Sequence, residues 1–399
     1  MKLLFDATEL SYYNDNDGHR AGVFYVALNL YKELKKLNID IDFICNYKRY
    51  YFLKQIDFFK DIKILEENSL INRLFAKLIY YTRNFPIRIK YCILIMTRFY
   101  DEYFYRINKK NLAQIKNYNI YFSPYTPPNK EIEQSNLKIF RMLHDTIPIQ
   151  EHGYPKSPKD WYYRIYNNIN DKDFYLTNSE CTRKDVLKYF SFVKENNIKT
   201  TLLGASSYFQ QSKEEVPIEG KYIFSLCTIG KRKNLEFSIR TFFKFIEKEN
   251  IQDLKLVLGG SVWTKYEKTL KSVLSNYDSS KVVLTGYLRE EELAKYYSNA
   301  LCFIFPSLYE GFGLPVLEAM KCGCPVITSN TSSLPEVIGN AGIQIDPTSD
   351  KEMIEAMTKM YKDEFFRQLC IERGLLRAQH FSWSKCASEL LEFIKEKCV

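Results

Sequence analysis

The amino-acid sequence predicts an α/β protein built as two units, each a parallel sheet with helices on both faces. The chain has 399 residues, which is long for one compact core and sufficient for two or three domains. Short apolar runs alternate with longer amphipathic stretches along its length, a pattern typical of parallel sheets between layers of helices. A polar segment without periodicity, residues 204–220, separates two such series. The boundary between the units is therefore expected near residue 205.

Composition and charge narrow the class of protein. Apolar residues make up 46% of the chain, charged residues 26%, and Gly and Pro only 15 and 13 residues, so collagen-like, low-complexity and largely disordered chains are excluded. The net charge of +9 is compatible with binding to nucleic acid, to an anionic membrane surface or to phosphorylated small molecules. Charge alone does not choose among these partners.

The N-terminal unit, residues 1–205, begins with a predicted strand at residues 2–6, which runs into a polar loop ending at Gly22. Apolar residues then recur at helical spacing over residues 23–34. Further strands of this unit are expected at residues 39–45, 120–122, 137–142 and 174–177. The alternation of strands and helices predicts a Rossmann-like domain.

The C-terminal unit, residues 206–380, repeats this pattern and is also predicted as a Rossmann-like domain. Its strands are expected at residues 222–226, 254–258, 282–284, 301–305, 326–328 and 343–345. A break at residues 381–383 precedes a last helix at residues 384–397. Residues 381–399 are therefore expected to form a C-terminal helix that can pack back on the N-terminal domain.

Two helix starts carry capping signals. Asn178 and Ser179 follow the strand at residues 174–177 and are expected to cap the next helix. Ser333 and Glu336 have the spacing of a capping box, in which each side chain bonds the backbone N–H of the other. Both features are interpreted as local structure rather than as chemistry.

The most informative stretch joins the strand at residues 301–305 to the following helix. The loop contains Gly311 and Gly313, and Pro315 stands where a first helical turn tolerates proline best. Such a junction directs free backbone N–H groups and a partial positive charge into the adjacent crevice. The sequence therefore predicts an anion site here, most simply for a phosphate.

Two carboxylates flank this junction. Glu310 precedes the helix and Glu318 lies about one turn inside it, so both can face the same crevice. Such a pair can accept hydrogen bonds from the paired hydroxyls of a sugar ring and a ribose. A solvated helix N-terminus is the alternative for either glutamate alone. The two glycines and the proline between them favour a ligand site.

A basic pair follows the strand at residues 222–226. Arg232 and Lys233 precede a helix that opens at Asn234, which places them at the carboxyl edge of a sheet, where ligands bind in open α/β folds. A planar guanidinium and a point-charge ammonium both suit phosphate oxygens. A solvated turn is the alternative for an isolated basic triplet. The position of the pair favours phosphate binding.

These motifs resemble glycosyltransferase family 4, retaining enzymes with two Rossmann-like domains that face each other across a cleft, the GT-B architecture. Their order resembles the mannosyltransferase-like branch that builds O-antigen and related cell-surface polysaccharides. The resemblance rests mainly on EGFGLPVLEAM, GCPVITSNTSSLPEVIGNAG, TIGKRKNL, GYLREEELAKYYSNA, TNSECTRKDV and HDTIPI. It implies transfer of a hexose, with mannose favoured, from a nucleoside-diphosphate sugar to a glycan or lipid-linked glycan acceptor.

The resemblance also implies roles for the charged residues. Glu310 is expected to bind hydroxyls of the donor sugar, and Glu318 the ribose of the nucleotide. Arg232 and Lys233 are expected to neutralise the donor diphosphate and the charge that develops as it leaves. No candidate nucleophile stands out, so the acceptor hydroxyl is expected to attack on the face from which the diphosphate departs. GDP-mannose is the first donor expected and a UDP-sugar the next.

Further roles follow from the same resemblance. The backbone of Phe312, Gly313 and Leu314 is expected to meet the sugar and the distal phosphate. His144, after the strand at residues 137–142, is assigned to the catalytic group, touching the donor sugar near its C6 hydroxyl; a structural hydrogen bond is the alternative. Gly22 is expected close to the donor phosphate and the acceptor, although one glycine alone reads as an ordinary turn residue.

No cofactor and no metal are expected. Asp15, Asn16, Asp17 and Gly18 place an Asp-x-Asp pattern in a polar loop, and this pattern holds a divalent cation in the other large glycosyltransferase architecture. The pattern is short, and the glycine is typical of a turn, so the four residues are interpreted as a turn. The ten cysteines form no CxxC pair.

Residues 83–110 are basic and rich in Phe and Tyr. A helix of this composition can lie on an anionic membrane leaflet and reach a lipid-linked acceptor, or it can be a domain helix with one buried stripe. No nucleic-acid-binding signature is present. Because no secretory signal or membrane-spanning run is found, a cytoplasmic protein is expected, with the inner face of the membrane as one location.

Two other classes of function stay open. A sugar-nucleotide epimerase of the same architecture would convert the donor without any acceptor. A non-catalytic basic protein that binds membrane or nucleic acid would show a steep salt dependence and no stabilisation by nucleotide-sugars.

Overall fold

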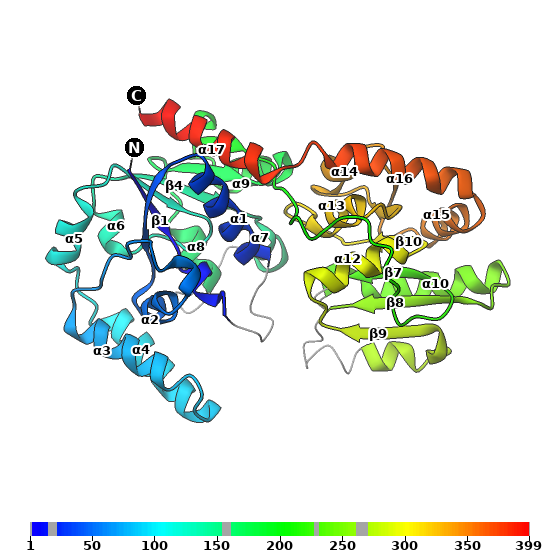
Figure 1. The fold of residues 1–399 in the computed structure, drawn as a ribbon, viewed down its shortest axis with the longest axis horizontal. Coiled ribbons are helices and arrows are strands. Elements are labelled where there is room, and N and C mark those ends of the chain that lie inside the picture. Colours follow the sequence, from blue (N-terminus) through cyan, green and yellow to red (C-terminus); the bar gives the residue numbers. More distant parts are fainter. Residues whose placement is uncertain (1, 15–21, 154–160, 227–230, 261–269, 399) are drawn as a thin grey trace.

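The structure, a computed structural model, describes residues 2–14, 22–153, 161–226, 231–260 and 270–398. They form two α/β domains that lie side by side, with the N-terminal domain on the left and the C-terminal domain on the right of Figure 1. Each domain contains one six-stranded sheet. Every strand pair in both sheets is parallel. The prediction of two Rossmann-like α/β units is confirmed.

The N-terminal sheet has the strand order β2-β1-β3-β4-β5-β6. Its strands are β1 (Lys2–Asp6), β2 (Asp40–Ile44), β3 (Ile120–Ser123), β4 (Lys138–Leu143), β5 (Phe174–Thr177) and β6 (Ile198–Thr200). Its helices are α1 (Gly22–Lys36), α2 (Tyr50–Lys54), α3 (Leu70–Tyr81), α4 (Ile87–Tyr103), α5 (Lys109–Ile115), α6 (Lys130–Glu133), α7 (Ile147–His152), α8 (Trp161–Asn167) and α9 (Glu180–Tyr189).

The C-terminal sheet has the strand order β12-β11-β10-β7-β8-β9. Its strands are β7 (Lys221–Leu226), β8 (Leu254–Gly259), β9 (Val282–Gly286), β10 (Cys302–Phe305), β11 (Val326–Ser329) and β12 (Ile343–Ile345). The helices that follow β7 include α10 (Leu235–Lys248), α12 (Glu290–Asn299), α13 (Leu314–Lys321), α14 (Leu334–Ile338), α15 (Asp350–Lys362), α16 (Glu364–Ala378) and α17 (Trp383–Cys398).

The strand orders locate the ligand site before any side chain is considered. In the C-terminal sheet the chain proceeds outward from β7 in one direction and from β10 in the other, so the order switches between these two strands. In the N-terminal sheet the corresponding switch lies between β1 and β3. Ligands of open α/β sheets bind outside the carboxyl ends of the strands at such a switch. Both switches point to the loops that carry the predicted site residues.

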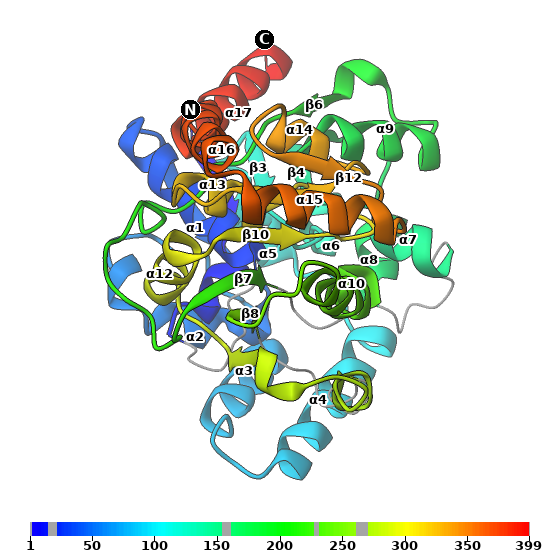
Figure 2. The same ribbon diagram turned by 90° about the vertical axis from the view of Figure 1, so that its right-hand side faces the viewer.

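Alternating side chains of the central strands pack on opposite layers of helices. Phe224 and Phe303 belong to the cluster that contains residues of α12 and α13. Their neighbours Ile223 and Ile304 belong to the cluster that contains residues of α10 and α15. This arrangement follows from the two-residue period of a strand, and Figure 2 shows α10 and α12 on opposite sides of the sheet. The near-continuous apolar runs of these strands are explained by burial on both faces.

The sequence pattern predicts eleven of the twelve strands found in the described residues and misses β6. β6 has three residues, of which only Ile198 is apolar, and it pairs with β5 alone at the edge of the sheet. A strand this short shows no alternation of apolar and polar residues.

The end of the chain packs on the N-terminal domain. The ring of Phe393 in α17 lies 5.8 Å from that of Phe140 in β4 and 6.1 Å from that of Phe174 in β5, measured between centroids. α17 also packs on α1, and Figure 1 shows it, in red, above the N-terminal domain. The chain therefore crosses between the domains twice, within residues 201–220 and again before α17.

Candidate active site

A cavity of about 490 Å³ opens between the two domains at the carboxyl ends of their sheets. The sequence analysis assigns nine residues to catalysis or donor binding, and eight of them line this cavity. They are Gly22, His144, Lys233, Glu310, Phe312, Gly313, Leu314 and Glu318. The ninth, Arg232, lines a neighbouring cavity of about 270 Å³, which shares Val23, His144 and Asp145 with the first. The fold thus gathers residues from across the chain at one place.

The start of α13 lies on this cavity. Gly313 is the N-cap residue and has φ of +118°, a conformation that glycine adopts without strain, and Pro315 occupies the first turn. The backbone N–H groups of Gly311, Phe312 and Gly313 have no hydrogen-bond partner among the described residues. Free donors at a helix N-terminus form a site suited to an anion.

The loop before α13, residues 306–313, touches the N-terminal domain so closely that a side chain does not fit at Gly311. A Cβ atom on this residue would lie 2.1 Å from the carbonyl oxygen of His144. The Gly311 carbonyl accepts hydrogen bonds from Ser179 Oγ at 2.6 Å and from Thr182 Oγ1 at 3.1 Å, both from the start of α9. The N-terminal domain therefore holds this loop in position across the cleft.

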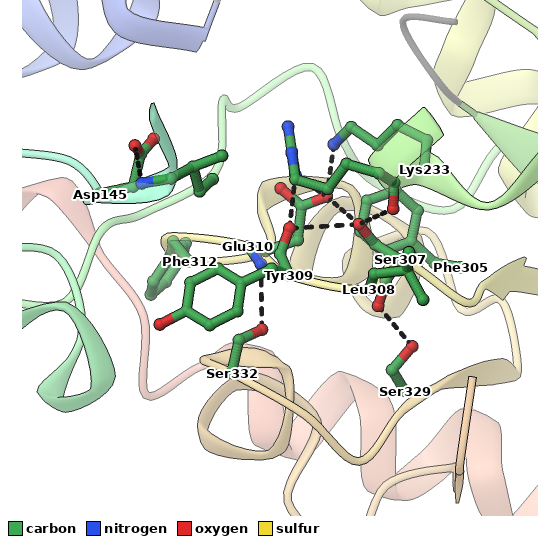
Figure 3. Close-up of polar contacts among 12 residues, drawn as sticks. Asp145, Lys233, Phe305, Ser307, Leu308, Tyr309, Glu310, Phe312, Ser329 and Ser332 are labelled. Carbon is green, nitrogen blue, oxygen red and sulfur yellow. Dashed lines mark hydrogen bonds and ion pairs between the residues drawn. The ribbon is translucent and has the colours of Figure 1, made fainter. Parts of the chain in front are cut away.

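Glu310 is the centre of a charged cluster (Figure 3). Its Oε1 lies 2.5 Å from Lys233 Nζ, 2.8 Å from Arg232 Nη1 and 2.6 Å from Ser307 Oγ. Burial alone would raise the pKa of Glu310, but Lys233 and Arg232 together hold it below its usual value. Glu310 is therefore ionised and neutralises the two cations, while Oε2 has no partner within the described residues.

Glu318 has the opposite surroundings in the same cavity. Burial, with a smaller contribution from the charge of Glu290, raises the pKa of Glu318 to about 8. Tyr297 donates a long hydrogen bond of 3.4 Å to Glu318 Oε2. At neutral pH this carboxyl group is therefore mostly protonated, and it can donate as well as accept a hydrogen bond.

His144 follows β4 and lines both cavities. Its Nε2 lies 2.7 Å from the carbonyl oxygen of Pro124, which requires Nε2 to carry the proton. Burial lowers the pKa of the imidazole to about 4, so the ring is neutral at neutral pH. Its Nδ1, which has no partner in the part of the chain that is described, is left to accept a hydrogen bond. The ring can thus contact a hydroxyl but does not supply a positive charge.

Gly22, Phe312 and Leu314 differ in what they bring to the cavity. The Phe312 ring points away into the core and packs against Phe381 with a centroid distance of 5.9 Å, so only its backbone is available to a ligand. A Cβ atom on Gly22 would meet only Leu314, at 3.7 Å across the cleft. Packing therefore does not require glycine at residue 22, and its role stays a prediction.

Sequence reasoning missed two cavity residues, Asn178 and Trp383. Both line the cavity, and the buried atoms Asn178 Oδ1 and Trp383 Nε1 lack a hydrogen-bond partner among the described residues. Of the two residues expected to cap α9, Ser179 does so, because its Oγ accepts a hydrogen bond of 3.0 Å from the backbone N–H of Thr182. The expectation is wrong for Asn178, whose side chain takes no part in the cap. No local pattern distinguishes these residues, because only the fold brings them to the cavity.

The expected capping box of Ser333 and Glu336 is wrong. Ser333 Oγ donates to the carbonyl oxygens of Glu310 and Phe312 and thereby braces the loop before α13. Glu336 reaches across the cleft, where its carboxylate accepts from the backbone N–H groups at the first two positions of α9, at 2.8 and 2.7 Å. A glutamate on one helix thus caps a helix of the other domain, a tertiary contact that local spacing does not reveal.

Some expectations fall outside what the structure describes. The Asp-x-Asp turn, residues 15–18, lies outside the described residues. Within the described ranges, no group of three or more His, Cys, Asp and Glu side chains is arranged to hold a metal ion. No described helix combines the length and apolar character needed to cross a membrane.

Residues 206–377 match the family described as glycosyl transferases group 1. O-antigen chain mannosyltransferase B of Escherichia coli is 29% identical over 239 residues, 58% of this chain and 62% of that protein. The serotype-specific mannosyltransferase WbdA, also of Escherichia coli, is 27% identical over 265 residues, 63% of this chain and 32% of that protein. The chain therefore spans less than two thirds of the length of these relatives.

The fold is also that of solved glycosyltransferase structures. The structure of Anabaena Alr3699/HepE in complex with UDP-glucose superposes with a TM-score of 0.70 and 13% identity, covering 99% of this chain and 100% of that one. The superposition therefore covers both domains. The C-terminal domain thus matches the group 1 glycosyltransferase family, and the whole chain has the two-domain GT-B fold.

Proposed function

We propose that this protein transfers a hexose, mannose in the first instance, from a nucleoside-diphosphate sugar to a glycan or lipid-linked glycan acceptor of a cell-surface polysaccharide, with retention of the anomeric configuration. One observation carries the proposal. The cavity at the two strand-order switches holds free N–H groups, the cation Lys233 with Arg232 beside it, and two carboxyl groups with different surroundings. These are the groups that a diphosphate joined to a sugar and a ribose requires.

The charges of the cavity suggest how the donor lies. The diphosphate occupies the start of α13, where the N–H groups of Gly311 to Gly313 are free and Lys233 stands 15% exposed at the side-chain level. The ribose then lies beside Glu318, further along the helix. The donor sugar lies toward His144 and the free Oε2 of Glu310, which accept hydrogen bonds from its hydroxyls. Binding of the diphosphate draws Lys233 and Arg232 away from their pairing with Glu310.

In the proposed reaction the bond between the anomeric carbon and the diphosphate oxygen breaks, and the acceptor oxygen bonds that carbon on the same face. The acceptor hydroxyl gives its proton to an oxygen of the departing phosphate. Lys233, Arg232 and the start of α13 stabilise the negative charge that grows on this phosphate. Closure of the domains around the donor excludes water, which would otherwise hydrolyse it.

The names of the relatives support the choice of sugar. The two Escherichia coli relatives are mannosyltransferases, one of them of the O-antigen chain. GDP-mannose is therefore the first donor proposed. A UDP-sugar is the second, since the HepE structure that shares the fold contains UDP-glucose.

A thermal-shift panel of nucleotide-sugars tests the proposal. A donor at one hundred times its dissociation constant stabilises the folded protein by about 2.7 kcal/mol. The Glu318→Ala variant is expected to lose most of this response, whereas Glu291→Ala, an exposed glutamate on α12, is expected to keep it. An equal response in the Glu318→Ala variant would overturn the ribose contact, and no response to any donor would overturn the function.

Product analysis separates the remaining alternatives. With a donor from the panel and lipid-linked glycans, mass spectrometry detects the extended acceptor, and NMR of the new linkage gives its anomeric configuration. Conversion of the donor to an isomer without any acceptor would instead identify a sugar-nucleotide epimerase.

A further inference from the structure

α3 and α4 form a helical hairpin, residues 70–103, whose large apolar side chains are mostly uncovered. Of the 25 large hydrophobic side chains that are exposed in the described part of the chain, 13 lie within residues 70–100. Leu70 and Ile87 are each 79% exposed, and Tyr91 is 65% exposed. Single exposed apolar residues need no explanation, but a gathering of this kind marks an interaction surface.

The hairpin is attached to the N-terminal domain by a different side. Ile93 and Thr97 of α4 are buried, as is Ala76 of α3. At the end of α4, Asp101 accepts a hydrogen bond of 2.8 Å from Tyr47 and pairs with Lys48 at 2.6 Å. The exposed apolar residues therefore belong to a hairpin that packs on the N-terminal domain by its other side. Their exposure does not arise from a segment that lacks tertiary contacts.

Up to residue 100, the charged side chains of the hairpin all have the same sign. Residues 70–100 contain six cations and no Asp or Glu. The cations are Arg73, Lys77, Arg83, Arg88, Lys90 and Arg98. The two acids of α4 are Asp101 and Glu102, at its last turn, where Asp101 is already paired with the body of the domain. The exposed surface is thus both apolar and basic.

We propose that the α3–α4 hairpin docks the protein on the surface of an anionic lipid bilayer. Exposed aliphatic and aromatic side chains enter the boundary between headgroups and acyl chains, and the cations pair with lipid phosphates. α3 has 12 residues and α4 has 17, fewer than the roughly 20 needed to span the hydrocarbon core, so the helices lie in the interface. The sequence interpretation of a helix with a single buried stripe does not explain the exposed apolar residues.

The charge also argues against a second copy of the chain as the occupant. In a symmetric dimer the same patch meets itself, so cations would face cations with no acid from residues 70–100 to neutralise them. An anionic bilayer supplies the missing charge. Figures 1 and 2 both show α3 and α4 at the bottom of the molecule, projecting from the N-terminal domain and away from its sheet. The hairpin is thus placed to meet a flat surface.

The inference goes beyond the proposed function, and its test needs neither donor nor acceptor. The full chain is sedimented with vesicles of phosphatidylcholine alone or of equal parts phosphatidylcholine and phosphatidylglycerol. Binding is expected only to the anionic vesicles, weakening steeply with salt. Arg83→Gln/Arg88→Gln is expected to bind about 25-fold more weakly, at roughly fivefold per cation. Ile95→Ser/Phe99→Ser is expected to bind at least tenfold more weakly, since both side chains are about half exposed.

Matched variants keep the test specific. Lys248→Gln/Lys351→Gln removes two exposed cations of the C-terminal domain, and Phe365→Ser/Leu376→Ser removes two exposed apolar side chains there. Both are expected to bind vesicles like the parent. Equal binding to neutral vesicles, no binding to either vesicle, or a dimer in light scattering that Ile95→Ser/Phe99→Ser dissociates would each overturn the proposal. A cooperative thermal unfolding transition like that of the parent, measured without ligand, serves as the folding control for every variant.

Discussion

Glu310 and Glu318 stand eight residues apart on one cavity and have opposite surroundings. Two cations and a hydroxyl surround Glu310, and the pKa of its carboxyl group is held below its usual value. Glu318 has a long hydrogen bond from Tyr297 and the charge of Glu290 nearby, and burial raises its pKa to about 8. Spacing along the chain therefore decides where a carboxyl group lies, while its neighbours in space decide whether it is charged.

In the proposed function, this difference gives the two groups different parts in ligand binding. The donor diphosphate would compete with Glu310 for the same cations, so binding would rearrange charge that is already present. A ribose that donates two hydrogen bonds to Glu318 favours its ionised form, so binding there releases a proton at neutral pH. The predictions below test this contrast.

The largest effect is expected at the cations. Lys233→Met keeps the length of the side chain and removes the charge that faces both Glu310 and the cavity. Removal of one group that stabilises a leaving phosphate is expected to lower kcat by about 10²–10³-fold. Steady-state transfer rates measure this, with Lys231→Met, its exposed neighbour, as control. A rate within about tenfold of the parent would contradict the role of Lys233.

Glu310→Gln is expected to have opposite effects on binding of the nucleoside diphosphate and on transfer of the sugar. The amide no longer competes for Lys233 and Arg232, so the free nucleoside diphosphate is expected to bind about tenfold more tightly. Transfer is expected to fall, because a charged contact to the donor sugar is lost. Calorimetry with the nucleoside diphosphate alone and a transfer assay measure the two effects. Weaker binding of the nucleotide to this variant would show that Glu310 does not compete with phosphate.

Glu318 is expected to make the stability of the protein depend on pH. The pKa of Glu318 is about 8 in the folded protein and has its ordinary value in the unfolded chain. At a pH between these two values, Glu318 is protonated in the folded state and ionised in the unfolded state. Its contribution to stability is complete below the unfolded pKa and is lost as the pH rises through about 8. The Glu318→Gln variant does not lose this stability, because an amide does not titrate. Its Tm is expected to rise relative to the parent by several degrees from about pH 6 to about pH 9.

Differential scanning calorimetry of both proteins across this pH range is the measurement for Glu318. A difference in Tm that stays constant with pH would contradict the raised pKa. Glu291→Gln, exposed on the same cavity-lining helix as Glu290, is the control and is expected to leave the pH profile unchanged.

The smallest effect is expected at Ser307. Ser307→Ala removes the hydroxyl 2.6 Å from Glu310 but leaves both cations in place. A loss of about 1 kcal/mol of stability is expected, a fall in Tm of about 2–4 °C, with nucleotide binding unchanged. Ser329→Ala, which removes a buried hydrogen bond of 2.7 Å to the Ser307 carbonyl, is the matched control. Loss of the nucleotide response in Ser307→Ala alone would mean that the hydroxyl, rather than the cations, orients Glu310.

Most strands and the location of the candidate site were predictable, because both follow from patterns of residues close together in the sequence. Buried parallel strands are continuous apolar runs, and the loop before α13 carries glycines whose need the structure explains at Gly311 and Gly313. The edge strand β6 was not predictable, since a short strand has too few residues to show a period. Glu336 was misassigned because its partner, the start of α9, belongs to the other domain.

The sequence alone determined two α/β units, the helix start that suits an anion, and the residues that lie near it. These features depend on interactions between residues close in the chain, which a linear pattern records. The tertiary structure alone decided that Lys233 and Arg232 pair with Glu310, that Glu318 is shielded beside Glu290, and that Asn178 and Trp383 reach the cavity. Charge and exposure depend on neighbours in space, and these are brought together only when both domains have folded.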